Sequence, residues 1–245
     1  MKYIVENKHR EFYHSAGWVT LGSLWTEAQL NEMTQQLRKT LAIRLNCSES
    51  RIEQQPATNK YLQGRDLWRE NVDLRRLITM RSVATVQAEL SKKHSLRLAF
   101  SQLLWSGPKE TLLPNELPWA GQAASLENCC SIQGMAGAVL IALTHPTLLP
   151  PIEPVMELSD EEDEEEPPAP IQYPGEQGET VFIAPSLPWQ LPPSEEPGLF
   201  CLIGYASVSA RYYIEKRDPF THTLKTMGYS AGDRLNETLH PIVCR

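Results

Sequence analysis

The chain has 245 residues, of which 41% are hydrophobic and 22% are charged, and its formal net charge at pH 7 is −7. These proportions are close to the average for globular proteins, so they exclude a fibrous or a wholly disordered chain. No apolar run reaches the roughly 18 residues of a membrane-spanning helix, and the charged N-terminus MKYIVENKHREFY lacks the apolar centre of a signal peptide. We therefore expect a cytoplasmic protein that does not bind a membrane.

The negative charge is concentrated in one short stretch. Residues 157–166 read ELSDEEDEEE, and removing these eight acids from the net charge of −7 leaves +1 for the rest of the chain. The surrounding stretch 150–178 is acidic, rich in proline and poor in apolar residues, which predicts a disordered insertion. Because strand-like runs flank it at 138–143 and 180–185, we expect it to interrupt a single domain that spans residues 1–245. The run from Glu157 to Glu166 either solvates this loop or binds a basic partner protein.

The N-terminal part of the chain predicts a helix, a strand and a second helix. Residues 8–15 are typical of a short helix, and residues 18–24 (WVTLGSL) alternate like a half-buried strand. Thr26 is followed three positions later by Gln29, a spacing typical of a capping box at a helix start. The buried face of this helix is expected to consist of Leu30, Met33, Leu37 and Leu41.

The middle of the chain predicts a core strand. After a polar stretch to about residue 60, which we expect to be a loop, Ser82 is placed to cap the start of a helix. The segment SLRLAFSQLLW (95–105) then alternates like a strand, with Leu98 and Phe100 expected on the same face. Short apolar runs separated by Pro and Gly follow it, so the chain is expected to be mainly β with α, with helices on one side of a sandwich or barrel.

Two long segments resemble a known enzyme family. EFYHSAGWVTLGSLWTEAQLNEMTQQL (11–37) is similar to the N-terminal helix, strand and helix of the phytanoyl-CoA dioxygenase branch of the Fe(II)/2-oxoglutarate oxygenases. DLWRENVDLRRLITMRSVATVQAELSKKHSLRLAFSQLLW (66–105) is similar to the part that follows, and is closest to a small chlamydial group with this fold that lacks the metal triad. The resemblance covers residues 8–105 and implies an α+β chain, with a double-stranded β-helix (jelly roll, cupin-like) core and N-terminal flanking helices.

Enzymes of this family hold ferrous iron with two histidines and a carboxylate, and the first pair is spaced His-x-Asp or His-x-Glu on a strand. Only His9 and Glu11 have this spacing here, and they lie in a predicted helix before the core. The resemblance implies the first pair after the 95–105 strand and the second histidine near TVFIAPSLPWQ (180–190). Neither neighbourhood contains a histidine. We therefore predict no metal ligand, no catalytic residue and no cofactor of the usual kind.

Two other features have a functional and a structural interpretation. Arg211, in SVSARYY (207–213), stands where the family holds the oxoglutarate carboxylate with a basic residue, so it is the candidate cofactor-binding residue. The alternative is that Arg211 pairs with a nearby acid or with solvent. The adjacent Cys129 and Cys130 suggest a nucleophile, but we favour buried packing for them.

The leading hypothesis is a catalytically inactive oxygenase-like protein that serves as a binding or regulatory module. One alternative is an active oxygenase with non-standard ligands, such as His145 or His222 with a distant acid. A second is a DNA-binding regulator, because five arginines lie between residues 65 and 81. The acids among these arginines and a sequence pI of about 5.5 instead favour a helix surface of ion pairs, so nucleic-acid binding is not expected.

Overall fold

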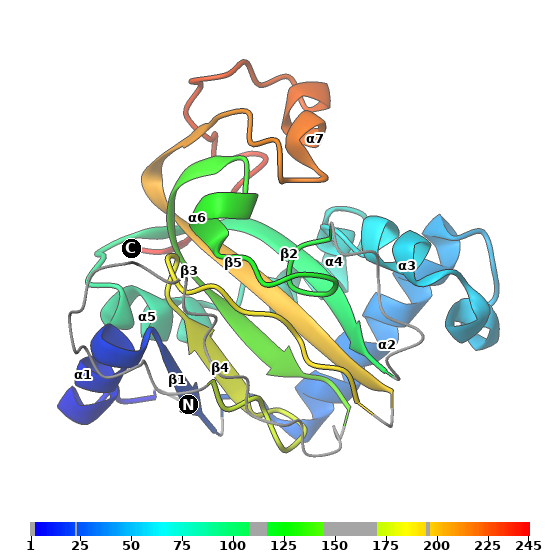
Figure 1. Cartoon of the computed structure of the whole chain (residues 1–245), viewed down its shortest axis with the longest axis horizontal. Coiled ribbons are helices and arrows are strands. Elements are labelled where there is room, and N and C mark those ends of the chain that lie inside the picture. Colours follow the sequence, from blue (N-terminus) through cyan, green and yellow to red (C-terminus); the bar gives the residue numbers. More distant parts are fainter. Residues whose placement is uncertain (1–2, 23, 108–116, 145–170, 195–196) are drawn as a thin grey trace, which may run out of the picture.

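A single antiparallel sheet forms the centre of the computed structural model, which describes residues 3–22, 24–107, 117–144, 171–194 and 197–245. Its six described strands are hydrogen-bonded in the order β1-β4-β3-β5-β2-β6, and Figure 1 shows the sheet twisted and curled across the molecule. No helix among the described residues is long and apolar enough to cross a membrane. The strands are β1 (Trp18–Leu21), β2 (Leu96–Ser106), β3 (Ile132–Ala142), β4 (Thr180–Ile183), β5 (Gly198–Tyr212) and β6 (Ile242–Cys244).

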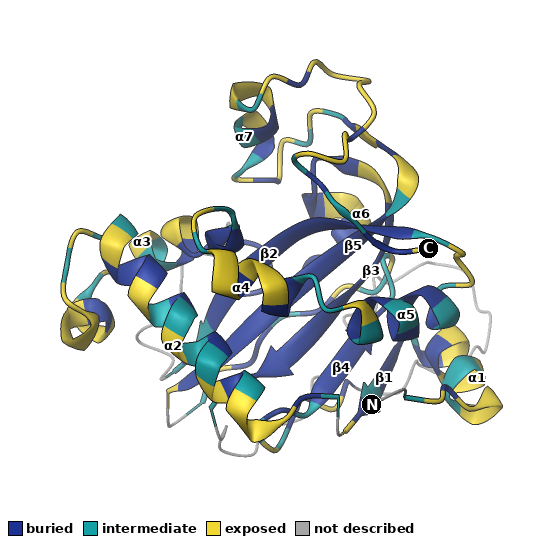
Figure 2. Cartoon of the chain, turned by 180° about the vertical axis from the view of Figure 1, so that it is seen from behind, coloured by how far each residue is buried: buried dark blue, intermediate teal, exposed yellow. Residues whose placement is uncertain are grey.

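Helices cover one face of this sheet. Figure 2 shows α2, α4 and α5 in front of the sheet, with their exposed sides turned to solvent and their buried sides turned to the strands. Helix α7 lies beyond one end of the strands, beside the C-terminal loops (Figure 1). The helices are α1 (Asn7–Ala16), α2 (Glu27–Arg44), α3 (Ala57–Gln63), α4 (Val72–Ile78), α5 (Arg81–Leu90), α6 (Leu126–Cys129) and α7 (Thr221–Thr226), with 3-10 turns η1 (Glu49–Gln54) and η2 (Leu67–Arg69).

Helix α2 begins and packs as its sequence predicts. The Gln29 backbone N–H donates to Thr26 Oγ1 at 3.2 Å, and the Thr26 N–H donates to Gln29 Oε1 at 2.9 Å, which completes the capping box. The expected apolar stripe is buried, with Met33 and Leu41 fully inaccessible to solvent. It packs with α4, α5 and the facing strand residues in a helix-side core. Helix α5 begins at Arg81 after Met80, so Ser82 lies inside the first turn and the predicted cap is wrong.

The stretch to residue 60 is not the simple loop that its polar sequence predicts. It contains η1 and the first half of α3. These short elements bury few side chains, chiefly Ile52 and Tyr61, so they leave no apolar periodicity in the sequence. Residues 145–170, which hold most of the predicted insertion, lie outside the described residues. Residues 171–178, which the prediction also placed in it, pack against the domain through Ile171 and Tyr173.

The opposite face of the sheet carries a second hydrophobic core, which we call the barrel-side core. It contains Phe100 of β2, Leu140 of β3 and Tyr212 of β5, together with Trp119 and Trp189 from loops. The central strands therefore bury both faces, and β2 is buried along almost its whole length. A strand buried on both faces lacks the apolar–polar alternation that would indicate which face each residue occupies.

A β-bulge in β2 decides which core receives Phe100. Leu98 pairs with Tyr205 and Phe100 pairs with Gly204, so two steps along β2 match one step along β5. The extra residue reverses the alternation. As a result Leu98 lies in the helix-side core, whereas Phe100 lies in the barrel-side core. The expectation that Leu98 and Phe100 share a face is therefore wrong.

Gly204 makes room for the ring of Phe100. A Cβ atom added at Gly204 would lie 2.4 Å from Phe100 Cε1 and 2.7 Å from Cζ, well inside van der Waals contact. The Phe100 ring therefore lies directly across the glycine of the neighbouring strand.

We expect Gly204→Ala to lower the free energy of unfolding by about 1–3 kcal/mol, because the new methyl group must displace a packed ring. Gly22→Ala is the matched control, since a Cβ at Gly22 meets nothing within 4 Å. Urea unfolding of both variants tests this expectation. Equal stabilities of the two variants would show that Phe100 is free to move.

Candidate functional site

The barrel-side core contains three stacked aromatic rings. The Phe100 and Trp119 ring centroids are 5.7 Å apart and those of Trp119 and Trp189 are 5.9 Å apart, with interplanar angles of 15° in both pairs. All three side chains are almost fully buried. Such offset-stacked pairs contribute about 0.5–1.5 kcal/mol each beyond their buried area. The three rings therefore form one continuous stack within the barrel-side core.

Arg65 and two further rings extend this stack. The Arg65 guanidinium carbon lies 3.7 Å from the centroid of Phe100 and 4.8 Å from that of Phe220. The Tyr61 ring in turn stacks on Phe220 at 5.9 Å. The result is a column of flat groups drawn from separate parts of the chain. We call it the planar column, and its members in order are Tyr61, Phe220, Arg65, Phe100, Trp119 and Trp189.

Backbone contacts hold the two tryptophans in place. Trp119 has a φ of +61°, in the left-handed region that bulky residues rarely adopt. Its backbone N–H donates to the Gln122 carbonyl at 2.9 Å, and its indole N–H donates to the Ala124 carbonyl at 3.0 Å. Ala124 also forms an antiparallel bridge with Trp189. Strain of this kind is retained where the surrounding structure over-determines it.

The planar column joins the two segments in which the resemblance implies the iron ligands. The described end of the first segment provides Trp119, and the 180–190 segment provides Trp189. The fold thus brings the expected segments together, but two indole rings meet there. Among the described residues, no group of three or more His, Cys, Asp or Glu side chains could hold a metal ion. The donor set in the described part of the chain does not fit ferrous iron.

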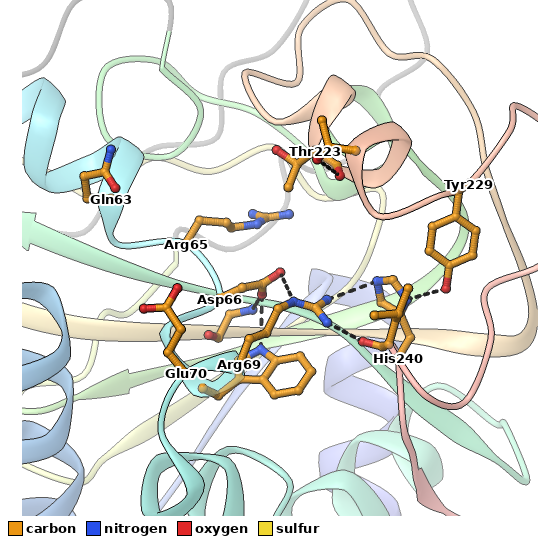
Figure 3. A network of polar contacts seen from close by, with 12 residues as sticks. Gln63, Arg65, Asp66, Arg69, Glu70, Thr223, Tyr229 and His240 are labelled. Carbon is orange, nitrogen blue, oxygen red and sulfur yellow. Dashed lines mark hydrogen bonds and ion pairs between the residues drawn. The ribbon is translucent and has the colours of Figure 1, made fainter. Parts of the chain in front are cut away.

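A network of polar side chains lies beside Arg65 of the planar column (Figure 3). Asp66 is buried and accepts hydrogen bonds from the Ser101 N–H at 2.8 Å, Trp68 Nε1 at 3.2 Å and Arg69 Nε at 3.1 Å. Burial raises the pKa of Asp66, but the charges of Arg69 and Arg65 together with the hydrogen bonds from Ser101 and Arg69 outweigh it, so the pKa lies below its usual value. Asp66 is therefore a buried, ionised anchor for Arg69.

Arg69 links this anchor to the C-terminal segment. Its guanidinium donates to the Leu239 carbonyl and lies 3.4 Å from His240 Nε2, while His240 Nδ1 lies 2.9 Å from the Tyr229 hydroxyl oxygen. Because a guanidinium carries only donors, Nε2 is the unprotonated nitrogen of the ring. Burial and the nearby Arg69 charge lower the pKa of His240 to about 3. His240 is therefore neutral at physiological pH. Its contacts with Arg69 and Tyr229 hold the C-terminal segment in place.

The residues singled out from the sequence lie in different places. Arg211 is exposed and donates to the Gly232 carbonyl, while its neighbours Ala210 and Tyr212 lie in the barrel-side core. Its role toward oxoglutarate stays a prediction. His222 is exposed on α7, and His145 lies outside the described residues.

The other candidates from the sequence, His9 and the two adjacent cysteines, lie in surroundings typical of structural residues. His9 lies in α1, where its Nδ1 accepts the Glu6 N–H at 3.3 Å. Cys129 and Cys130 are both buried. Burial, together with the Cys130 thiol, raises the pKa of Cys129 above its usual value, which keeps it in the unreactive thiol form.

The arginines between residues 65 and 81 have separate surroundings. Arg69 is paired with Asp66, and Arg76 is paired with Glu32 at 2.8 Å. Arg75 lies over the Trp68 ring at 5.2 Å. Arg65 points instead toward the barrel, where it joins the planar column. Sequence reasoning grouped it with the surface arginines and missed this role, because no local pattern marks it.

Surface hollows border α6, outside the barrel. One of about 590 Å³ is lined by the end of α1 and by residues 184–188. A second of about 390 Å³ shares Ser186 and Pro188 with the first and is also lined by Cys129 and Arg217. They offer room for a small molecule or a peptide segment.

Comparison with solved structures identifies the fold. The α-ketoglutarate-dependent epimerase SnoN from nogalamycin biosynthesis matches with a TM-score of 0.69 at 18% identity, over 97% of this chain and 98% of its own. The carbocyclase SnoK from the same biosynthesis matches with a TM-score of 0.66 at 16% identity, over 97% and 96%. This chain therefore has the jelly-roll fold of the Fe/2-oxoglutarate oxygenases, which confirms the fold class predicted from the sequence.

The other comparisons add little to this result. CT296 from Chlamydia trachomatis matches with a TM-score of 0.44 at 11% identity, over 84% of this chain and 99% of its own. No protein-family model matches the sequence. No curated protein matches it either. The relation to these oxygenases is thus one of fold.

The unfolding free energy should fall in mild acid because of His240. Its folded-state pKa of about 3 lies below the ordinary value of 6.5, so its stabilisation is complete above pH 6.5 and is lost as the pH falls toward 3. We expect the native chain to be about 2 kcal/mol less stable at pH 5 than at pH 8 on this account, as measured by urea unfolding. His240→Gln should lose this difference, and the exposed His14→Gln should keep it. The same pH dependence in all three proteins would contradict the assignment.

Proposed function

We propose that this protein is a catalytically inactive relative of the Fe(II)/2-oxoglutarate oxygenases, related to their phytanoyl-CoA dioxygenase branch, that serves as a binding or regulatory module. The observation that carries the proposal is the contact between Trp119 and Trp189. These rings meet where the resemblance implies the ligands of the iron. Stacked indole rings supply neither the imidazole nitrogen nor the carboxylate oxygen that ferrous iron binds in this kind of site. Because these two rings are buried and stacked on each other, they fill this part of the core.

The proposal includes a protein partner. The acidic run from Glu157 to Glu166 would attract a basic surface through its concentrated negative charge. The surface hollows beside α6 would provide room for a segment of that partner. A pull-down with the full chain and with a chain lacking residues 157–166 separates the contributions of the run and of the folded domain.

Iron binding tests the catalytic part of the proposal. Anaerobic calorimetry should detect no stoichiometric Fe(II) binding, with or without 2-oxoglutarate, because the described residues supply no set of ligands. The epimerase SnoN, which has been solved with Fe³⁺ and α-ketoglutarate, is the positive control. Tight binding of one Fe(II) that 2-oxoglutarate strengthens would contradict the proposal. It would favour an active oxygenase with non-standard ligands, with His145 and His222 as the first residues to mutate.

A further inference from the structure

Two arginines lie directly opposite each other at the end of β5. Arg211 forms an antiparallel bridge with Arg234 of the C-terminal segment, and both residues are exposed. This bridge lies at the end of the sheet that carries α7 and the C-terminal loops (Figure 1). Side chains opposite each other in such a bridge project from the same face, and like charges in this position are destabilising. We call these two residues the arginine pair.

The arginine pair has no acidic partner in the described part of the chain. Arg211 donates to the Gly232 carbonyl, which leaves its remaining N–H donors to solvent. The Arg234 side chain forms no hydrogen bond and no ion pair with any described residue. The neighbouring carboxylate, that of Asp233, accepts the Ser230 N–H at 2.7 Å instead. The fold therefore does not neutralise the charge of the pair.

A surface hollow begins beside the arginine pair. Gln133 of β3 is the register partner of Arg211 and lines this hollow. Tyr213, two positions after Arg211 and so on the same face, lines it as well. The hollow has a volume of about 440 Å³, and Ile132 and Met135 contribute to its lining. Arginine, tyrosine and methionine are enriched at protein interfaces. The pair and the hollow together form what we call the β5-end surface.

The β5-end surface continues toward α6. Its hollow shares Glu127 and Met135 with the larger hollow of about 590 Å³. Lys93 lines the larger hollow, is exposed and has no ion-pair partner among the described residues. Glu127 is the one acid that lines either hollow within that part of the chain. Positive charge therefore predominates along a path long enough for several residues of a peptide.

We propose that the β5-end surface binds an acidic segment of a partner protein, with carboxylates on the arginine pair and an apolar side chain in the adjacent hollow. Carboxylates form charge-assisted hydrogen bonds with guanidinium groups, and complementary charge orients the partner. An apolar side chain in a neighbouring hollow supplies the anchor. The inference goes beyond the proposed function, in which this chain supplies the acidic side of a contact. It is also separate from the candidate role of Arg211 toward oxoglutarate, because the ligand is a protein segment on the outer surface.

Peptide binding to the full chain tests this inference. The fluorescence anisotropy of a labelled hexaglutamate peptide should show saturable binding that weakens as NaCl is added. We expect Arg211→Gln/Arg234→Gln to bind about ten-fold more weakly, because two guanidinium–carboxylate contacts are lost. The matched control is Arg51→Gln/Arg75→Gln, which removes the same charge from two exposed arginines without an acidic partner among the described residues. The control should bind within about two-fold of the native chain, because its charges lie away from the surface.

Two longer peptides test the hollow. Hexaglutamate followed by leucine should bind about three-fold more tightly than hexaglutamate followed by glycine, because the leucine side chain leaves water. Equal affinities would contradict the assignment of the hollow as the anchor site.

Three results would overturn the inference. One is an equal loss of affinity in the two double variants, which would indicate general charge attraction. Another is tighter binding of a single-stranded DNA of the same net charge, which would indicate a nucleic-acid surface. The third is binding only to a chain that lacks residues 157–166, which would show that the acidic run of the chain itself takes the place of the partner, or binding to neither chain. None of these results depends on iron or on a basic partner, so the inference can fail while the proposed function stands.

The stability of the free protein provides an independent readout. Because the two arginines repel each other, Arg234→Gln should keep or raise the Tm of the native chain at low ionic strength. A marked fall of Tm would show that Arg234 has a partner within the folded chain, which would contradict the inference.

Discussion

The stacking of flat side chains across the barrel is the constraint on which the rest of the structure depends. Phe100, Trp119 and Trp189 come from a strand and two loops, and the centroids of neighbouring rings in this stack lie within 6 Å of each other with nearly parallel planes. Burying such large aromatic side chains contributes roughly 1.5–3 kcal/mol each. The stack also fixes the backbone around it, since Trp119 adopts a left-handed conformation that no local preference favours. Packing of these three rings therefore fixes the arrangement of the loops and the strand that meet in the barrel-side core.

The polar network complements this packing at the edge of the barrel. Asp66, Arg69 and His240 tie the segment before β2 to the last residues of the chain, and Arg97 of β2 donates to the Leu235 and Val208 carbonyls. The buried Asp66–Arg69 ion pair adds little net stability, because the loss of hydration offsets the attraction of the two charges. Its effect is specificity, since removing one partner leaves the other buried without a counter-charge. The C-terminal segment is thus held in one arrangement.

Local signals in the sequence were sufficient for much of the scaffold. The Thr26–Gln29 capping box and the apolar stripe of α2 depend on residues within a few turns, so their prediction succeeds. The face that Phe100 occupies depends on a bulge against β5 and on the space at Gly204, which no local alternation contains. The position of Arg65 depends on rings from β2 and from the segment before α7. These non-local contacts are the ones that build the site, so the sequence predicted the fold better than the site.

The central claim is that the part of the barrel that would hold iron is occupied by packed aromatic rings. Anomalous diffraction at the iron absorption edge, from crystals grown anaerobically with Fe(II), tests this claim most directly. The account predicts no iron peak in the barrel and stacked Trp119 and Trp189 rings in the electron density. An iron peak between the 117–124 and 185–191 segments, with the two rings moved apart, would contradict it.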